Sequence, residues 1–133
     1  MTAFLDANVP MYAAGRAHSA KGPCLDLLRR VATGEVDAAT DVEVLQEILH
    51  RFCALGRIDD GVRLFDHVVQ VVPVILPVDL EDAMSARRLL ARIASITARD
   101  AIHAAVMRRH GIEVIYSFDR HFDAVPGIRR VEP

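Results

Sequence analysis

The sequence predicts an α/β fold in which a parallel sheet is flanked by helices. Two observations support this class. The first is that short apolar segments of strand character alternate with amphipathic helical segments. The second is the length of 133 residues, which suffices for one domain but not for two. Hydrophobic residues make up 52% of the chain, which is enough for a core and excludes a disordered chain. We therefore expect a single domain over residues 1–133.

The elements of the first third of the chain follow from short local patterns. Residues 2–5 are apolar and predict a strand, and Pro10 is tolerated in the first turn of a helix over residues 9–14. Spaced apolar residues followed by a glycine predict a helix over residues 22–33. Residues 36–39 predict a second strand.

A capping box predicts where the next helix begins. Thr40 and Glu43 have the spacing at which a hydroxyl and an acid bond to each other's backbone N–H groups. We therefore expect Thr40 to be the N-cap of a helix that runs to Gly56. Another helix is expected over residues 59–69, and a β-branched, proline-bounded strand near a sheet edge over residues 71–78.

Two more helices are expected in the second half of the chain. Asp79 is expected to cap a helix over residues 79–92, and Thr97 with Asp100 forms a second capping-box-like start of a helix that ends near residue 110. The remaining segments are predicted as a strand, a loop and a last strand, over residues 112–116, 119–126 and 128–131.

Four acidic residues far apart in the chain stand inside or beside apolar runs: Asp6, Glu47, Asp100 and Asp119. Removing a carboxylate from water costs free energy unless something compensates its charge. A divalent cation would compensate all four, and ligands of parallel sheets bind beyond the carboxyl ends of strands, where Asp6 and Asp119 are expected. Oxygen ligands of this kind suit Mg²⁺ or Mn²⁺.

Each of these acids also has an ordinary structural role open to it. Asp6 and Asp100 would cap helices, Glu47 would lie on a solvated helix face, and Asp119 would be a turn residue. Considered one at a time, the four acids leave these roles open.

Taken in order, the acids and their neighbours resemble the four motif blocks of the PIN-domain family, and most closely the VapC-like toxin ribonucleases of bacterial toxin–antitoxin pairs. The blocks are residues 4–9, Thr40 with residues 44–48, residues 99–105 and residues 117–122. Ala7 departs from the pattern, because many relatives have a small hydroxyl residue there. The resemblance covers nearly the whole chain and implies a PIN-like three-layer α/β/α sandwich with a mostly parallel sheet of four to five short strands.

The resemblance implies a metal-dependent endoribonuclease that hydrolyses RNA phosphodiester bonds as the toxin of such a pair. Asp6 and Asp100 would bind Mg²⁺, or Mn²⁺, directly, and Glu47 and Asp119 would do so partly through water. The residues that would orient these carboxylates by hydrogen bonds are Asn8, Thr40 and Ser117. A structured RNA such as a tRNA or rRNA loop is the expected substrate.

RNA binding requires local cations, because the formal net charge of the chain is −2. Arg99, Arg120 and His121 adjoin the proposed ligands and are expected to contact phosphate, although a solvated helix face is the alternative for the arginines. His103, one turn after Asp100, is expected to pack between helices rather than to act in catalysis. Two tyrosines and no tryptophan favour recognition of shape and phosphate over an aromatic platform.

The hydrophobicity of individual segments bears on the partners and the location of the protein. The apolar stretch over residues 45–78 indicates either a thick core or a surface that another chain covers, and the resemblance implies a homodimer and a small antitoxin. We expect a cytoplasmic protein, since no segment reaches the roughly 20 apolar residues of a membrane span and no signal peptide is evident. Cys24 and Cys53 fall in helical apolar patterns and are expected to be buried, reduced thiols.

Two other functions remain open from the residues alone. One is a PIN nuclease of RNA maturation or DNA processing, and the other is a non-catalytic α/β interaction module whose acids only cap helices and turns. A zinc enzyme is disfavoured, since the six histidines form no His-Glu-x-x-His pattern and the cysteines are not paired.

Overall fold

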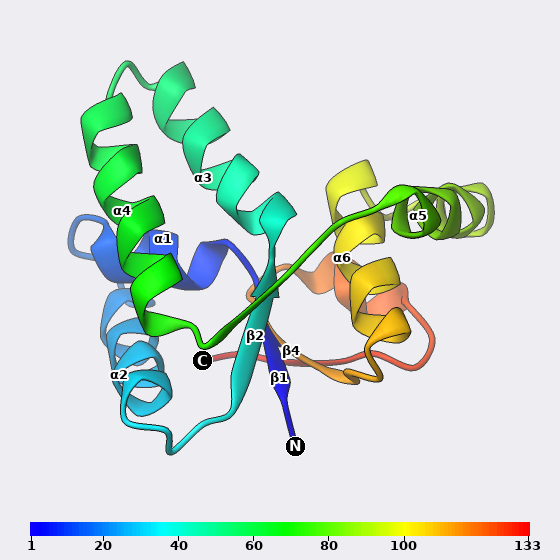
Figure 1. Cartoon of the computed structure of the whole chain (residues 1–133), viewed down its shortest axis with the longest axis horizontal. Helices are drawn as coiled ribbons and strands as arrows, with labels where there is room; N and C mark the ends of the chain where they lie inside the picture. The colour runs from blue at the N-terminus through cyan, green and yellow to red at the C-terminus, as the bar shows by residue number, and fades with distance from the viewer.

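A five-stranded sheet forms the centre of the molecule, and helices cover both of its faces (Figure 1). The computed structural model describes residues 1–133. The strands are β1 (Ala3–Leu5), β2 (Ala38–Asp41), β3 (Val74–Leu76), β4 (Val114–Tyr116) and β5 (Arg129–Val131). They lie in the order β3-β2-β1-β4-β5, and every neighbouring pair is parallel. The expected α/β class is confirmed, and the sheet predicted as mostly parallel is parallel throughout.

Six α-helices and one short 3-10 helix complete the fold. The α-helices are α1 (Asn8–Ala14), α2 (Lys21–Ala32), α3 (Val42–Ala54), α4 (Ile58–Val71), α5 (Leu80–Arg92) and α6 (Ala98–Arg109). Helices α1, α2 and α4 pack together on one face of the sheet, and α5 packs with α6 on the other (Figure 1). Helix α3 packs against α4 and also reaches α6. This is the three-layer α/β/α arrangement implied by the family resemblance.

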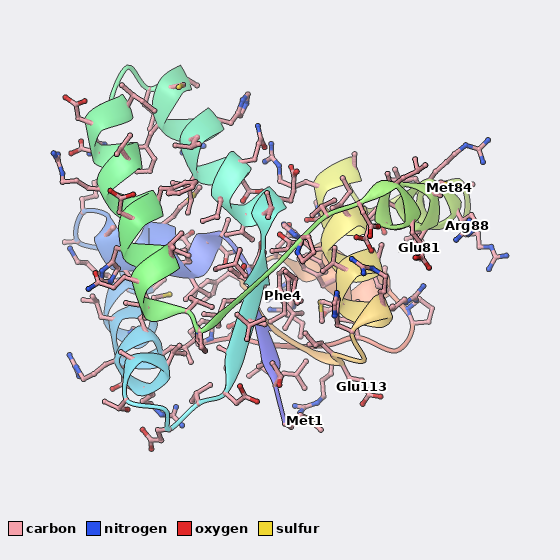
Figure 2. All side chains as sticks on the ribbon, viewed as in Figure 1. Met1, Phe4, Glu81, Met84, Arg88 and Glu113 are labelled. Atoms are coloured by element: carbon pink, nitrogen blue, oxygen red, sulfur yellow. The ribbon has the colours of Figure 1, made fainter.

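The core lies on both sides of the central strand β1, which is buried over its whole length. Parallel strands covered on both faces are apolar throughout, as the first segment of the chain is. Figure 2 shows Phe4 of β1 inside the molecule, whereas Met84 and Arg88 project outward from α5. The edge strands β3 and β5 are partly exposed, and the predicted edge position of the third strand is confirmed.

Because all strands are parallel, their carboxyl ends meet at one edge of the sheet. Asp6 follows β1, Asp41 ends β2, and Ser117 and Asp119 follow β4. Helix α3 also begins at this edge, directly after Asp41. The topology thus brings polar residues from distant parts of the chain to one place.

The expected capping box at Thr40 is wrong. Strand β2 continues through Asp41, which pairs with Leu76 of β3, and Asp41 is the N-cap of α3. The carboxylate of Asp41 accepts a hydrogen bond of 2.9 Å from the backbone N–H of Val44. Thr40 is buried in the strand and its hydroxyl donates to the carbonyl of Leu5 over 2.8 Å. The capping boxes at Asp79 and Thr97 are present.

Other boundaries also differ from the expected ones. The second strand was expected over residues 36–39 and covers Ala38–Asp41. The third strand was expected over residues 71–78 and covers only Val74–Leu76, and Val71 belongs to α4. The expected loop over residues 119–126 contains the 3-10 helix η1 (Arg120–Ala124), whose N-cap is Asp119.

The two cysteines lie in different surroundings. Cys24 is buried in α2, as expected, but Cys53 is exposed near the end of α3. The expectation for Cys53 is wrong because the last turn of α3 lies beyond the covered part of the helix, where Ala54 and Leu55 are exposed as well. No helix of the structure combines the length and the apolar character needed to cross a bilayer.

Candidate active site

Asp6 lies at the end of the central strand and is held by three donors. One carboxylate oxygen accepts a 2.8 Å hydrogen bond from the backbone N–H of Ala7. The other accepts bonds from the Ser117 hydroxyl at 2.6 Å and from the Asn8 amide at 3.3 Å. The amide of Asn8 also donates to Ser117 Oγ over 3.1 Å. The structure therefore brings Asp6, Asn8 and Ser117 together and leaves Asp6 only 5% exposed.

Asp100 and Asp119 meet around His121. Asp100 Oδ2 lies 3.3 Å from His121 Nδ1, and Asp119 Oδ1 lies 3.2 Å from the same nitrogen. One ligand atom from each of these residues lies within 4.8 Å of the other two, a grouping that suits a metal ion. Both acids also have the ordinary roles: Asp100 completes the capping box with Thr97, and Asp119 caps η1. The structural and functional alternatives are thus compatible with each other.

The group around Asp6 and the group around Asp100 adjoin each other. The Ser117 hydroxyl that donates to Asp6 also accepts a 2.9 Å bond from the backbone N–H of Asp119. The negative charge of Asp100 acts on Asp6 as well. Residues from β1, α6 and the segment after β4 therefore form one acidic site at the carboxyl edge.

Glu47 stands at the rim of this site on α3 and is paired with an arginine. Its carboxylate lies 3.0 Å from Arg99 Nε, and Glu43 lies 3.7 Å from the same atom. Arg99 was expected to contact phosphate, but here it links α6 to α3. Arg120 is exposed, and His121 faces the two acids. Thr40, which was expected to orient a carboxylate, donates to a backbone carbonyl instead.

Burial and mutual repulsion set the charge states of the acids. Burial raises the pKa of Asp6, and the charge of Asp100 adds to the rise, while His103 and the hydrogen bonds from Ser117 and Ala7 oppose it. Burial also raises the pKa of Glu47, and the charge of Asp6 contributes. Arg99 beside Glu47 and His103 beside Asp6 offset part of this rise, and the hard oxygens of the carboxylates fit Mg²⁺ or Mn²⁺. The donor set therefore fits the metal that the resemblance implies.

Asp41 and His103 belong to this region although the sequence patterns did not select them for it. Both are fully buried, and His103 Nδ1 lies 2.8 Å from Asp41 Oδ2. Burial would lower the pKa of His103, but Asp41, Asp6 and Glu47 outweigh that effect and raise it to about 9. Asp41 ends a strand just as Asp6 follows one, so its position at a strand's carboxyl end was an available signal.

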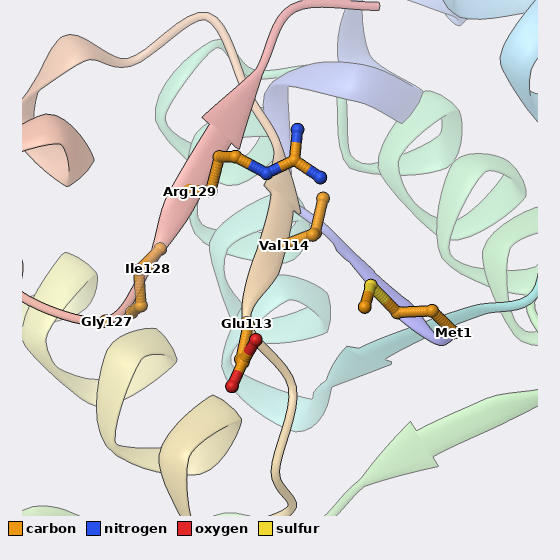
Figure 3. Close-up of a pocket in the computed structure, with 6 residues that line it drawn as sticks. All are labelled: Met1, Glu113, Val114, Gly127, Ile128 and Arg129. Carbon is orange, nitrogen blue, oxygen red and sulfur yellow. The ribbon is translucent and has the colours of Figure 1, made fainter.

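Two open hollows of the surface lie away from the acidic site. One is open and lies near the starts of β4 and β5, at the amino edge of the sheet (Figure 3). It is lined by Met1, Glu113, Val114, Gly127, Ile128 and Arg129. Its single carboxylate, Glu113, gives it no set of metal ligands, so the acidic site remains the candidate.

Comparison with known proteins identifies the family of the chain. The chain matches the PIN domain over residues 3–128. It is 42% identical over 127 residues to VapC ribonuclease Mb1869c of Mycobacterium bovis and to ribonuclease VapC13 of Mycobacterium tuberculosis, which covers 96% of this chain and 97% of each relative.

Solved structures show the same fold. Mycobacterium tuberculosis VapC20, described as a toxin that cleaves the sarcin-ricin loop, has a TM-score of 0.78 and 22% identity over 98% of this chain and 99% of its own. VapBC2 from Rickettsia felis, bound to a promoter DNA fragment, has a TM-score of 0.74 and 15% identity over 99% of this chain and 98% of its own. Since the domain match spans nearly all of the chain and the relatives are similar over their whole length, this chain belongs to the PIN-domain family and to its VapC-like members.

Proposed function

We propose that this chain is a metal-dependent endoribonuclease and the toxin of a toxin–antitoxin pair. The observation that carries the proposal is the convergence of buried or half-buried carboxylates from the end of β1, α3, α6 and the segment after β4 in a chain 42% identical to VapC ribonucleases. The acids in question are Asp6, Glu47, Asp100 and Asp119. Asp6 and Asp100 bind the cation directly, and Glu47 and Asp119 do so partly through water.

The residues of the chain hold the reacting groups in place. When bound, Mg²⁺ or Mn²⁺ supplies positive charge for the phosphate and lowers the pKa of the attacking water. Ser117 and Asn8 fix the carboxylate of Asp6, and Thr97 fixes that of Asp100 through the capping box. In-line attack at phosphorus would form a bond to the water oxygen and break the bond to the 3′ oxygen. The attacking water would release its proton to bulk water, and the departing 3′ oxygen would take a proton from bulk water.

The substrate is a structured RNA with an accessible loop, of the tRNA or rRNA kind. VapC20, which shares the fold, is described as cleaving the sarcin-ricin loop. Arg120 and His121 contact phosphate beside Asp119, and Arg99 does so if RNA draws it from Glu47. This substrate locates the enzyme in the cytoplasm.

The partners are a second copy of the chain and a small antitoxin. Apolar side chains remain exposed along α4 and α5, namely Ile58, Val62, Val69, Leu80 and Met84. Ile58, Val62 and Val69 share one face of α4, and exposed apolar side chains gathered on one face support contact with another chain. VapBC structures from Rickettsia felis and Salmonella typhimurium share the fold.

The nuclease is tested with Asp6→Asn and Asp100→Asn. With Mg²⁺ or Mn²⁺ the parent cleaves total tRNA and rRNA, and each variant loses about 100-fold or more in kcat/KM. Glu113→Gln, at the opposite edge, is the matched control and retains the parental rate. Either ion also raises the Tm of the parent but not of the two variants. Folded Asp6→Asn and Asp100→Asn proteins that cleave at the parental rate would refute the proposal.

The toxin role has its own test. Expression of the parent arrests growth of a bacterial host, expression of Asp6→Asn does not, and co-expression of a short neighbouring gene product relieves the arrest. If the parent cleaves RNA and growth continues, the toxin role is wrong and a role in RNA maturation takes its place.

A further inference from the structure

A buried polar pair lies beneath the acidic site, and the proposed chemistry does not use it. His103 of α6 and Asp41 at the end of β2 are each 0% exposed, and their side chains are joined over 2.8 Å. His103 Nε2 faces Asp6, 3.8 Å from Oδ1, and has no hydrogen-bond partner. Burying an acid and an imidazole costs free energy that an apolar pair of the same size would avoid.

The pair connects the elements that carry three of the four acids, Asp6, Glu47 and Asp100. His103 follows Asp100 by three residues on α6, so the two side chains share one face of the helix. Asp41 uses its other carboxylate oxygen to cap α3, the helix of Glu47. The free ring nitrogen of His103 faces Asp6 at the end of β1. The pair thus links α6, α3 and the end of β1, three of the elements from which the acidic site is built.

Packing alone does not account for a histidine at this position. The buried residues of α6 other than Asp100 and His103 are apolar, and the His103 ring lies 5.3 Å from the ring of Phe4. A leucine would pack on Phe4 without a polar atom of its own to satisfy, but it would leave Asp41 without its partner. The distance of 3.8 Å to Asp6 exceeds a hydrogen bond, so the ring borders the carboxylate and limits where it can lie.

We propose that His103 is a positioning residue for the nuclease: Asp41 fixes the orientation of its ring, and its Nε2 edge holds the Asp6 carboxylate where it binds the divalent cation together with Asp100. The inference rests on the proposed function. Side chains that orient metal ligands in this way typically change metal affinity by about 10- to 100-fold when they are replaced.

Two variants separate the two ring nitrogens. In His103→Asn the amide nitrogen takes the place of Nδ1, so the bond to Asp41 is kept and nothing polar faces Asp6. In His103→Gln the amide nitrogen takes the place of Nε2, so a polar group still faces Asp6, but the hydrogen bond to Asp41 is lost. We expect the Mn²⁺ dissociation constant to rise by about 3-fold in His103→Gln and by about 10- to 100-fold in His103→Asn. A role in packing alone would lower the Tm without metal and leave the Mn²⁺ affinity of the folded protein unchanged.

A third protein removes the polar pair without removing the helix cap. The double variant His103→Leu with Asp41→Asn retains an N-cap oxygen for α3 and has no charge at these two positions. We expect the Tm of this double variant without metal to stay near that of the parent. Its Mn²⁺ affinity should fall as in His103→Asn. Its kcat should fall by a larger factor than the factor by which its KM for RNA changes. Asp82→Asn, a change at a buried acid of α5 remote from the site, is the control that lowers stability and leaves Mn²⁺ affinity unchanged.

The measurements are Mn²⁺ titrations followed by electron paramagnetic resonance, thermal unfolding without metal, and single-turnover cleavage of RNA. The inference is overturned if the folded double variant, or His103→Asn where the double variant does not fold, binds Mn²⁺ and cleaves as the parent does. A parent that neither binds Mn²⁺ nor cleaves RNA overturns the proposed function itself, so the two failures are distinguishable.

Discussion

At the scale of single residues, two acidic side chains each have a structural role and a proposed functional role. Asp100 accepts the backbone N–H of Thr97 as part of a capping box and lies 3.3 Å from His121 in the acidic group. Asp119 likewise caps η1 and belongs to the same group. The caps fix the side-chain orientation before any ligand arrives, which reduces the ordering cost of binding. The ordinary roles that the sequence left open therefore support the site.

Residue surroundings also decide thiol reactivity. Burial raises the pKa of Cys24 to about 11, whereas Cys53 is exposed. Since the thiolate is the reactive form, an aromatic disulfide reagent at pH 8 should modify one thiol per native chain and the second only after unfolding. Cys53→Ser should abolish the native reaction and Cys24→Ala should preserve it. Fast native labelling of Cys53→Ser would contradict the burial of Cys24.

At the scale of elements, the contact between α3 and α4 depends on a glycine. A Cβ added at Gly61 would lie 2.6 Å from the Cβ of Phe52, whereas a Cβ added at Gly22 in α2 meets nothing within 4 Å. We expect Gly61→Ala to destabilise the protein by about 1–3 kcal/mol, because α4 must move away from α3. The control Gly22→Ala should stabilise it by up to about 1 kcal/mol. Urea denaturation measures both, and equal effects of the two changes would argue against close packing of the two helices.

The contact between α5 and α6 should make stability depend on pH. Hydrogen bonds from Arg109, each 2.8 Å long, hold the pKa of Asp82 below its ordinary value of 3.8. A lowered folded-state pKa stabilises the protein above pH 3.8, and this stabilisation is lost as pH falls through the folded value. Asp82→Asn should therefore lower stability by about 1.5–3 kcal/mol at pH 7 and by less at pH 3. Thermal unfolding at the two pH values tests this, and a pH-independent difference would be inconsistent with an ionic contact.

At the scale of the whole molecule, the charge pattern requires local recognition of RNA. The formal net charge is −2 and the candidate site is acidic, so a polyanion gains nothing from the overall field. Arg120 is exposed beside Asp119, whereas Arg99 is paired with Glu47. RNA binding should consequently depend on a few arginines at the carboxyl edge.

The salt dependence of RNA affinity measures how many contacts form between arginines and phosphates. Arg120→Ala should weaken RNA binding several-fold and reduce the slope of log affinity against log salt by about 1. Arg129→Ala, at the opposite edge of the sheet (Figure 3), should change neither quantity. Binding to an inactive Asp6→Asn protein, followed by fluorescence anisotropy, gives both values. Equal effects of the two arginines would place the RNA elsewhere on the surface.

The sequence by itself determined the kinds and order of the elements and the residues of the four acidic blocks. Helix periodicity, strand character and the caps at Asp79 and Thr97 depend on residues a few positions apart, so they can be recognised without a fold. The order of strands and their parallel pairing then place Asp6 and Ser117 side by side, although 111 residues separate them.

Only the tertiary structure decided what surrounds those blocks. Pairing of Asp41 with Leu76 extends β2 by the residue that displaces Thr40 as the cap of α3. The burial of His103 against Asp41 and the pairing of Arg99 with Glu47 each join two separate elements. Contacts of this kind depend on strand order, register and helix placement, and no local pattern of residues specifies them.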